Sequence, residues 1–494
     1  MAKKPVQLDE KGYRKFGMLD KVAYAAGDFG CNMSFSLKST VQTFWLVFMT
    51  LETGLLSTLL LLVQIWDAIN DPIIGAMIDA DTRQYKRGKF KTYILIGAVA
   101  LIVGGAAVFL PFPNASTFVK AMLFIIGYVI WDAAYTMANV PYGSMLSLVT
   151  EDAGERAQLS TWRSIGSMFG NILPSVILPM LIWHKEVDAN GNPVINPATG
   201  VQVETLLGNR VFIAALLMGV LGFIAFLFMI NKITIRVNEN SVKTNEGGEK
   251  FNILKAFGNF IKNRPAVGAT VAAMAMFLGM NSATTATTIM FATYFGQAQL
   301  SGIVMMVGFL PMFLFMGFIK KIVNKFGKQE SAAAGALVSM IGGILMFVFP
   351  MISNKGLALL AFMAALIIFG LGMGIYTCVS WAFMADAIDY NEWKTGKREE
   401  GTVYSLHSFF RKLAQGIGPS IVLAIMGGLG YISALGTGGQ SAATAYNMCW
   451  LVAGLYCFSG IVMFISIKFI YNLNKKTLAQ MNDELAARRS VSAE

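Results

Sequence analysis

The sequence is poor in charged residues and in the residues that enzymes most often use for catalysis or metal binding. Only 14% of its 494 residues are charged, whereas a soluble domain has roughly a quarter. Histidine occurs twice, at His184 and His407, and the four cysteines lie in apolar segments without metal-ligand spacing. No nucleophile–base set or metal motif is present, so we expect neither an enzyme nor a cofactor-binding protein.

We also expect no cleavable secretion signal, because the first twenty residues are polar and basic. The 55% of residues that are hydrophobic gather instead in continuous runs of about twenty, the length at which a helix crosses a bilayer. These runs disfavour a soluble helical protein. We expect an all-α membrane protein with twelve transmembrane helices near residues 21–47, 55–79, 92–112, 117–146, 158–183, 209–231, 265–295, 301–323, 331–352, 357–388, 401–430 and 446–470.

Lysine and arginine gather in every second loop between these runs. Because they favour the cytoplasmic side, both termini are expected to be cytoplasmic, and the net charge of +11 reflects this bias rather than nucleic-acid binding. The longest basic loop divides the chain into two similar parts. The expected domains are an N-terminal six-helix half (1–231), a cytoplasmic linker (232–264), a C-terminal six-helix half (265–470) and a cytoplasmic tail (471–494).

The second expected helix contains two carboxylates, which are costly inside a membrane and usually functional. Asp67 and Asp71 are four residues apart and share a helical face with Asn70. With two carboxylates this close, either one of them holds a proton or a cation bridges them, so the pair suits Na⁺ and H⁺ alike. The alternative is a structural ion pair with Arg163 or Lys412.

Further polar side chains lie in other expected helices, and together they favour helices that line an aqueous cavity. Hydrogen bonding between helices is the alternative. An aromatic among hydroxyl groups suits a sugar ring. The candidate substrate-binding residues are Asp28, Asn32, Asp132, Asn139, Arg163, Thr377, Trp381, His407, Ser408, Arg411 and Lys412.

Several segments resemble the glycoside–pentoside–hexuronide:cation symporters, a family of the major facilitator superfamily typified by the melibiose carrier. The resemblance runs through nearly the whole chain. It is strongest in Trp66–Pro72 with Gly75, in the following Arg-Gly-Lys-Phe-Lys run, in Tyr135–Pro141, at Arg163 and in Ala385–Gly401. It implies a major facilitator fold in a bacterial cytoplasmic membrane and symport of a sugar with a cation by alternating access.

The resemblance also implies roles for individual residues. Asp67 and Asp71 would bind the cation, directly as metal ligands if it is Na⁺, with Asn70 and Thr136 contributing. Arg163, Ser408 and Lys412 would lie at the sugar site. Between Na⁺, Li⁺ and H⁺ the sequence does not choose.

This chain departs from the melibiose-carrier pattern at the sugar site. Cys31 and Asn32 replace a lysine–aspartate pair, Asn139 and Gly143 replace an aspartate and a tryptophan, and Thr377 replaces a tryptophan. Carboxylates are therefore lost, while Lys38, Arg411 and His407 add to Arg163 and Lys412. We hypothesise an acidic sugar such as a uronide, since arginine binds carboxylates through two parallel hydrogen bonds. A neutral pentoside or glucoside stays open, because Asp28 and Asp132 offset the added charge.

The expected partners are a small sugar or glycoside, a coupling cation and the lipid bilayer, with no nucleic acid, and the protein is expected to be a monomer. The alternative function is a lipid or lysophospholipid transporter of the same fold. The hydroxyl-rich seventh helix, with Asn281, Ser282, Thr284 and Thr285, argues against it. A sensor that binds without transport would carry a soluble output domain, and the sequence has no such segment.

Overall fold

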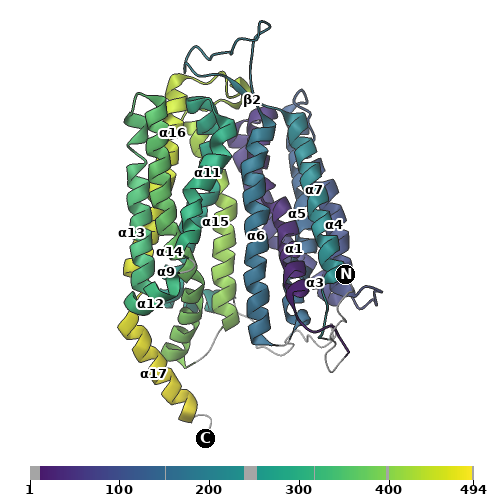
Figure 1. The fold of residues 1–494 in the computed structure, drawn as a ribbon, viewed down its shortest axis with the longest axis vertical. Coiled ribbons are helices and arrows are strands. Elements are labelled where there is room, and N and C mark those ends of the chain that lie inside the picture. The colour runs from purple at the N-terminus through teal and green to yellow at the C-terminus, as the bar shows by residue number, and fades with distance from the viewer. Residues whose placement is uncertain (1–11, 151, 238–252, 316–317, 397–399, 492–494) are drawn as a thin grey trace, which may run out of the picture. The chain divides into compact units, whose positions relative to one another are not determined.

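The computed structural model describes residues 12–150, 152–237, 253–315, 318–396 and 400–491. The chain forms two compact units, which are described separately. Unit 1 comprises Met1–His184 and Thr205–Gly247, and unit 2 comprises Lys185–Glu204 and Gly248–Glu494. Both are built almost entirely of helices (Figure 1).

Unit 1 consists of long helices that run side by side (Figure 1). Helix α1 packs against α6 and α7, α4 packs against α5 and α7, and α3 packs against α5. The elements are α1 (Met18–Phe35), α2 (Leu37–Thr43), the π-helical turn η1 (Phe44–Phe48), α3 (Thr53–Ala80), α4 (Lys89–Ala107), α5 (Thr117–Val149), α6 (Ala153–Ile182) and α7 (Gly208–Lys232).

Glycines on α6 allow the close packing of α6 against α1. A Cβ atom on Gly166 would lie 2.0 Å from the backbone oxygen of Ala25, and one on Gly170 would lie 2.9 Å from that of Phe29. Small residues let helix backbones approach in this way where lipid provides no hydrophobic driving force between helices. The approach places α6 side chains beside the polar face of α1.

In unit 2, α13 packs against α14 and α16, while α9 packs against α14, α15 and α16. The elements are α8 (Ile253–Lys262), α9 (Arg264–Phe277), η3 (Leu278–Ser282), α10 (Ala283–Met290), η4 (Phe291–Phe295), η5 (Ala298–Leu300), α11 (Ser301–Phe309), η6 (Leu310–Phe315), α12 (Ile319–Phe326), α13 (Lys328–Leu345), η7 (Phe349–Met351), α14 (Lys355–Thr395), α15 (Glu400–Gly428), η8 (Ser433–Leu435), α16 (Ala442–Ile465), η9 (Ser466–Ile470) and α17 (Lys475–Val491).

Within the described residues, nine helical stretches are long and apolar enough to cross a membrane. Three of the twelve expected spans are not among them. The first includes most of α1, which contains Asp20, Lys21 and Asp28, and the eleventh contains Arg411 and Lys412 in α15. In the eighth, the apolar stretch Ala298–Met312 is shorter than a membrane span, and residues 316–317 are not described. Charged side chains and a short apolar stretch therefore set these three apart.

The predicted helix boundaries differ most at α14, which was expected over 357–388 and continues to Thr395. The polar segment after residue 385 is therefore largely helix. Its end is joined to α17, since Trp393 donates from Nε1 to Glu484 at 2.6 Å and Arg488 donates to the Trp393 carbonyl at 3.0 Å. The tail is thus a helix attached to unit 2.

The connection between α6 and α7 forms a small hairpin of β1 (Trp183–Lys185) and β2 (Glu204–Leu206). Its residues 185–204 pack within unit 2. The carboxylate of the fully buried Glu204 accepts from the Ala298 backbone, while its carbonyl accepts from Thr437 Oγ1 at 2.5 Å. Lys355 donates to the Thr199 carbonyl at 3.0 Å. These contacts make residues 185–204 an integral part of unit 2.

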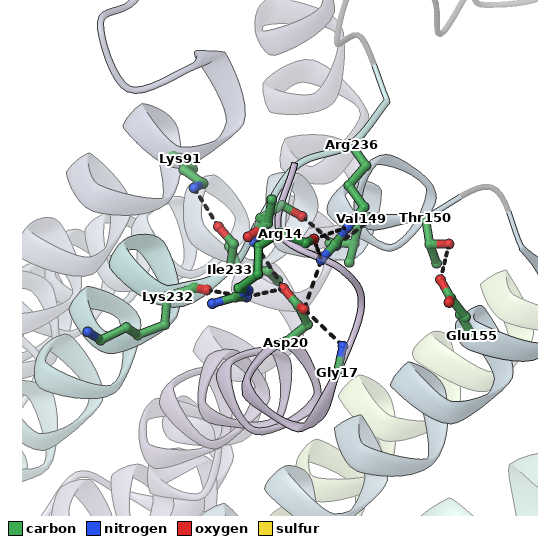
Figure 2. A network of polar contacts seen from close by, with 11 residues as sticks. Arg14, Gly17, Asp20, Lys91, Val149, Thr150, Glu155, Lys232, Ile233 and Arg236 are labelled. Carbon is green, nitrogen blue, oxygen red and sulfur yellow. Dashed lines mark hydrogen bonds and ion pairs between the residues drawn. The ribbon is translucent and has the colours of Figure 1, made fainter. Parts of the chain in front are cut away.

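A network around the fully buried Asp20 closes one end of unit 1 (Figure 2). The carboxylate accepts from Arg14 at 2.5 Å and from Arg236 at 2.9 Å. Arg14 also donates to the Lys232 carbonyl, and Arg236 to the Val149 carbonyl at 3.1 Å. Asp20 and the two arginines that bind it thus connect the N-terminal segment, the end of α5 and the chain that follows α7.

Candidate functional site

The polar face of α3 points to α5 within unit 1. Thr136 donates from Oγ1 to Asp71 Oδ1 at 2.7 Å, and the Asn70 amide donates to Asp132 Oδ2 at 3.3 Å and to Thr136 Oγ1 at 3.4 Å. This contact follows from spacing, because Asp67, Asn70 and Asp71 share one side of α3 and residues four apart on α5 do the same. The residues proposed for the cation therefore lie together.

Asp132 is the first difference from the sequence-based assignment. Sequence analysis placed Asp132 with the substrate-binding residues, but its carboxylate accepts a hydrogen bond from the Asn70 amide at 3.3 Å, beside the acids of α3. It is almost fully buried, with 3% of its surface exposed. The carboxylate cluster, as we call Asp67, Asp71 and Asp132, therefore contains three acids rather than two.

Lys38 on α2 is the second difference. Its Nζ lies 3.9 Å from Asp67 Oδ2, and both side chains are partly exposed. Sequence analysis considered Arg163 or Lys412 as an ion partner for the helix-two acids and counted Lys38 among the cations near the sugar. The structure instead pairs Asp67 with Lys38.

The chemistry of the cluster is set by low dielectric and oxygen donors. Three carboxylates in a largely buried site repel one another unless protons or cations compensate their charge. Carboxylate and hydroxyl oxygens suit hard cations, and the same carboxylates suit protons. Among the described residues, however, no group of three or more acidic, histidine or cysteine side chains converges as a metal-binding set would. The arrangement can therefore hold a compensating positive charge, either as a cation or as a proton.

A second polar group joins α1 and α6. Arg163 donates from Nε to Asp28 Oδ1 at 2.9 Å, Asn32 donates to Asp28 Oδ2 at 3.0 Å, and Asn171 donates to Asn32 Oδ1 at 2.7 Å. The Arg163 guanidinium also lies 5.2 Å from the centre of the Tyr142 ring. Asp28 is buried while Arg163 is partly exposed. The positive charge of Arg163 is thus balanced inside unit 1.

In unit 2 the predicted residues lie on α14 and α15. His407 is buried and shares a 2.9 Å hydrogen bond between Nδ1 and Thr270 Oγ1, and the Arg411 guanidinium lies 5.5 Å from the Phe277 ring centre. Thr377 Oγ1 donates to Met276 Sδ at 3.8 Å. His407 therefore acts in helix packing through at least one of its nitrogens.

The remaining predicted residues vary in exposure. Asn139 on α5 and Ser408 on α15 are half-buried, and Lys412 is exposed. Trp381 belongs to α14, but its side chain is outside the part of the chain that the structure describes. Two separate polar groups thus form in unit 1, around Asp67 and around Asp28.

Sequence reasoning missed two contributors. Asn171 extends the Asp28 group, and Gln64 donates to Tyr128 Oη at 2.8 Å beside the carboxylate cluster. Each is an uncharged polar residue in an apolar helix. Gln64 precedes Asp67 by three residues and Asn171 follows Arg163 by eight, so both lie near the face of the charged residue. That helical spacing could have identified both residues from the sequence.

Relatives of this chain are membrane transporters. The chain is 29% identical over 495 residues to the "uncharacterized symporter YjmB" of Bacillus subtilis (strain 168), with 98% of each chain covered. It is 26% identical to the isoprimeverose transporter of Lactiplantibacillus pentosus, covering 96% of this chain and 93% of that protein. It is also 26% identical to the glucuronide carrier protein homolog of Escherichia coli (strain K12), covering 95% of this chain and 96% of that protein.

Solved structures show the same fold. A D-xylose-proton symporter superposes with a TM-score of 0.59 at 16% identity, covering 92% of this chain and 97% of that one. The nucleoside transporter NupG gives a TM-score of 0.57 at 15% identity, covering 92% of this chain and 100% of that one. The fold is therefore the all-helical major facilitator fold. Residues 23–475 match the family model described as MFS/sugar transport protein, so the resemblance seen in the sequence is confirmed and the chain belongs to this family of membrane transporters.

Proposed function

We propose that this protein is a cation-coupled symporter that imports a sugar or glycoside by alternating access. The carboxylate cluster carries the proposal, because Asp67, Asp71 and Asp132 lie beside Asn70 and Thr136 in helices that are apolar enough to span a membrane. Placing carboxylates inside a membrane costs free energy, and carboxylates found there usually have a function. Binding and release of a cation at this cluster is such a function.

The cluster couples the two solutes by changing its charge. With the cation bound, the negative charge of the cluster is reduced, which favours the conformation that binds sugar tightly. By linkage, sugar then raises cation affinity by the same factor. The carriers of this fold expose a midplane site to each side in turn. We assign the cation to Asp67, Asn70, Asp71 and Thr136, and add Asp132 to that set.

For the topology we propose twelve spans, with the stretches 18–48, 298–326 and 400–428 completing the nine apolar ones. We further propose two six-helix halves joined by the basic linker 232–264, followed by the tail 471–494, with both termini in the cytoplasm of a bacterial cell. The distribution of lysine and arginine supports this orientation. We propose that the monomer is the transporting unit.

We propose an acidic sugar as the substrate. Two of the basic residues on which this proposal was based are paired with acids in the structure. Arg163 is paired with Asp28 and Lys38 with Asp67, so in unit 1 their charge is balanced. We assign a substrate carboxylate to Arg411 and Lys412 on α15, because guanidinium and ammonium groups form charge-assisted hydrogen bonds with carboxylates. The similarity to a glucuronide carrier homolog supports this assignment, while the similarity to an isoprimeverose transporter supports a neutral glycoside.

The test uses purified protein in liposomes with imposed Na⁺ and proton gradients. Labelled glucoside and the matching glucuronide are offered to the wild type and to Asp67→Asn. We expect gradient-driven accumulation in the wild type and only equilibration through counterflow in the variant, with the glucuronide preferred. Asp81→Asn, outside the cluster, is the matched control. Undiminished accumulation by Asp67→Asn would contradict cation coupling, and equal uptake of both sugars would contradict the acidic substrate.

A further inference from the structure

Lys38 occupies an unusual position, because a lysine lies inside the proposed cation site. It is the second residue of α2, directly after the break at Ser36 that ends α1. Its Nζ lies 3.9 Å from Asp67 Oδ2 and 5.0 Å from the centre of the Phe35 ring. The Phe35 ring and the Asp67 carboxylate thus both lie near the ammonium group of Lys38. This ammonium group lies beside the carboxylate cluster.

The groups that face Lys38 come from two helices. From α3 they are Asp67 and Asp71, and from α5 they are Asp132 and the hydroxyl of Tyr128, all of which interact with it electrostatically. The α1 carboxylate of Asp28 is instead bonded to Arg163. Lys38 therefore adds a permanent positive charge to three carboxylates.

Neutral groups donate to the other two acids of the cluster. Asn70 donates to Asp132 at 3.3 Å, and Thr136 donates to Asp71 at 2.7 Å. Lys38 therefore brings to the cluster a positive charge that these donors do not supply.

A sodium ion at the same place would meet Lys38. It needs several oxygen ligands at close range, and Asp67 already directs an oxygen to the ammonium group. Two positive charges held a few ångströms apart in a poorly solvated site repel each other strongly. A proton needs neither the space nor the ligands, since it binds to a carboxylate oxygen directly.

We propose that Lys38 is a resident cation that takes the place of a coupling Na⁺ and so excludes Na⁺ from the carboxylate cluster. This inference rests on the proposed function, because it concerns which ion a cation-coupled carrier accepts. Lys38 is a specificity-determining residue in this scheme. Removing the ammonium group leaves a cluster of acids and an amide into which Na⁺ or Li⁺ fits.

The experiment measures cation binding without any sugar. Purified wild type, Lys38→Ala, Lys38→Gln and Lys38→Arg are titrated with NaCl, with choline chloride at equal ionic strength as the reference. The readouts are the thermal unfolding midpoint and binding of radioactive Na⁺. We expect Na⁺-specific stabilisation and saturable Na⁺ binding in Lys38→Ala and Lys38→Gln, tighter than in wild type by at least about tenfold. Lys38→Arg, which keeps the charge, should behave as wild type does.

Two further variants separate this proposal from the proposed function. Adding Asp67→Asn to Lys38→Ala should abolish the acquired Na⁺ binding. Equal Na⁺ binding by wild type and Lys38→Ala would overturn the role of Lys38 and leave cation coupling intact. Folded Lys38→Ala and Lys38→Gln that both fail to bind Na⁺ would overturn it as well. A different result would contradict the proposed function itself, namely undiminished gradient-driven uptake by the single variant Asp67→Asn.

Discussion

Arg163 on α6 binds the carboxylate of Asp28 on α1 through a hydrogen-bonded ion pair of 2.9 Å. Asp28 is almost completely buried and Arg163 is partly open, so the pair joins two helices whose backbones approach closely through Gly166. Removing one partner leaves the other unbalanced, and this cost is largest for the buried member. The pair thus makes the charge of Asp28 tolerable inside unit 1.

Arg163→Gln should therefore destabilise the protein more than the double variant Arg163→Gln/Asp28→Asn. A buried ion pair that loses one partner costs about 3–5 kcal/mol, and the exposure of Arg163 places the expected cost near the lower end. The double variant leaves no uncompensated charge and should recover a large part of that loss. Thermal unfolding in detergent measures both. Equal midpoints for the single and double variants would show that the pair carries no coupling.

Thr136→Val should weaken binding of the coupling cation while the protein folds normally. The change removes the hydroxyl that donates to Asp71 at 2.7 Å and that accepts from Asn70. A hydrogen bond to a charged group contributes about 1.5–3 kcal/mol, which corresponds to a loss of roughly 10- to 100-fold. Thr136→Ser keeps the hydroxyl and should retain near-normal affinity. Uptake measured against cation concentration gives the half-saturation values, and similar values for Val and Ser would contradict the prediction.

Asp20→Ala should loosen the end of unit 1 shown in Figure 2. The change leaves Arg14 and Arg236 without the buried carboxylate that both bind, at a cost of about 3–5 kcal/mol. We expect faster hydrogen exchange at Thr234, whose amide donates to Asp20 at 3.2 Å. Asp152→Asn is the control, because asparagine caps a helix as well as aspartate does. Unchanged exchange at Thr234 would show that the chain after α7 is held by other contacts.

The hairpin between α6 and α7 should be more stable at acidic pH. Burial raises the pKa of Glu204 above its ordinary value, against the opposing effects of the Ala298 and Gln299 amides and of Lys185. A pKa that is higher in the folded than in the unfolded state gives stability that is complete below the unfolded value. That stability is lost as pH rises through the folded value.

The comparison with Glu204→Gln isolates this titration, because glutamine accepts the same bond and stays neutral. As pH rises above about 4.3, the ordinary pKa of a glutamate, wild type should lose stability relative to the variant, as measured by unfolding midpoints and by protection of the Ala298 amide. A difference between the two proteins that does not change with pH would rule out titration of Glu204 in this range.

Much of the fold followed from the sequence, since apolar run length and periodicity are local properties. Nine of the expected spans coincide with apolar helices of the described chain, and the shared face of Asp67, Asn70 and Asp71 follows from helical spacing alone. Boundaries were less predictable. Helix α14 continues through polar residues to Thr395, because its end is stabilised by contacts with α17 that no local pattern encodes.

The sequence by itself determined that this is a multi-pass transporter of the sugar-transport family with acids inside its helices, because bilayer thickness imposes a run length and each intramembrane charge stands out against apolar neighbours. Only the tertiary structure decided how those charges pair. Lys38 faces Asp67, Arg163 faces Asp28, and Asp132 joins the carboxylate cluster. Spacing fixes which residues share a helical face, but the rotation of one helix against another depends on packing along their whole length.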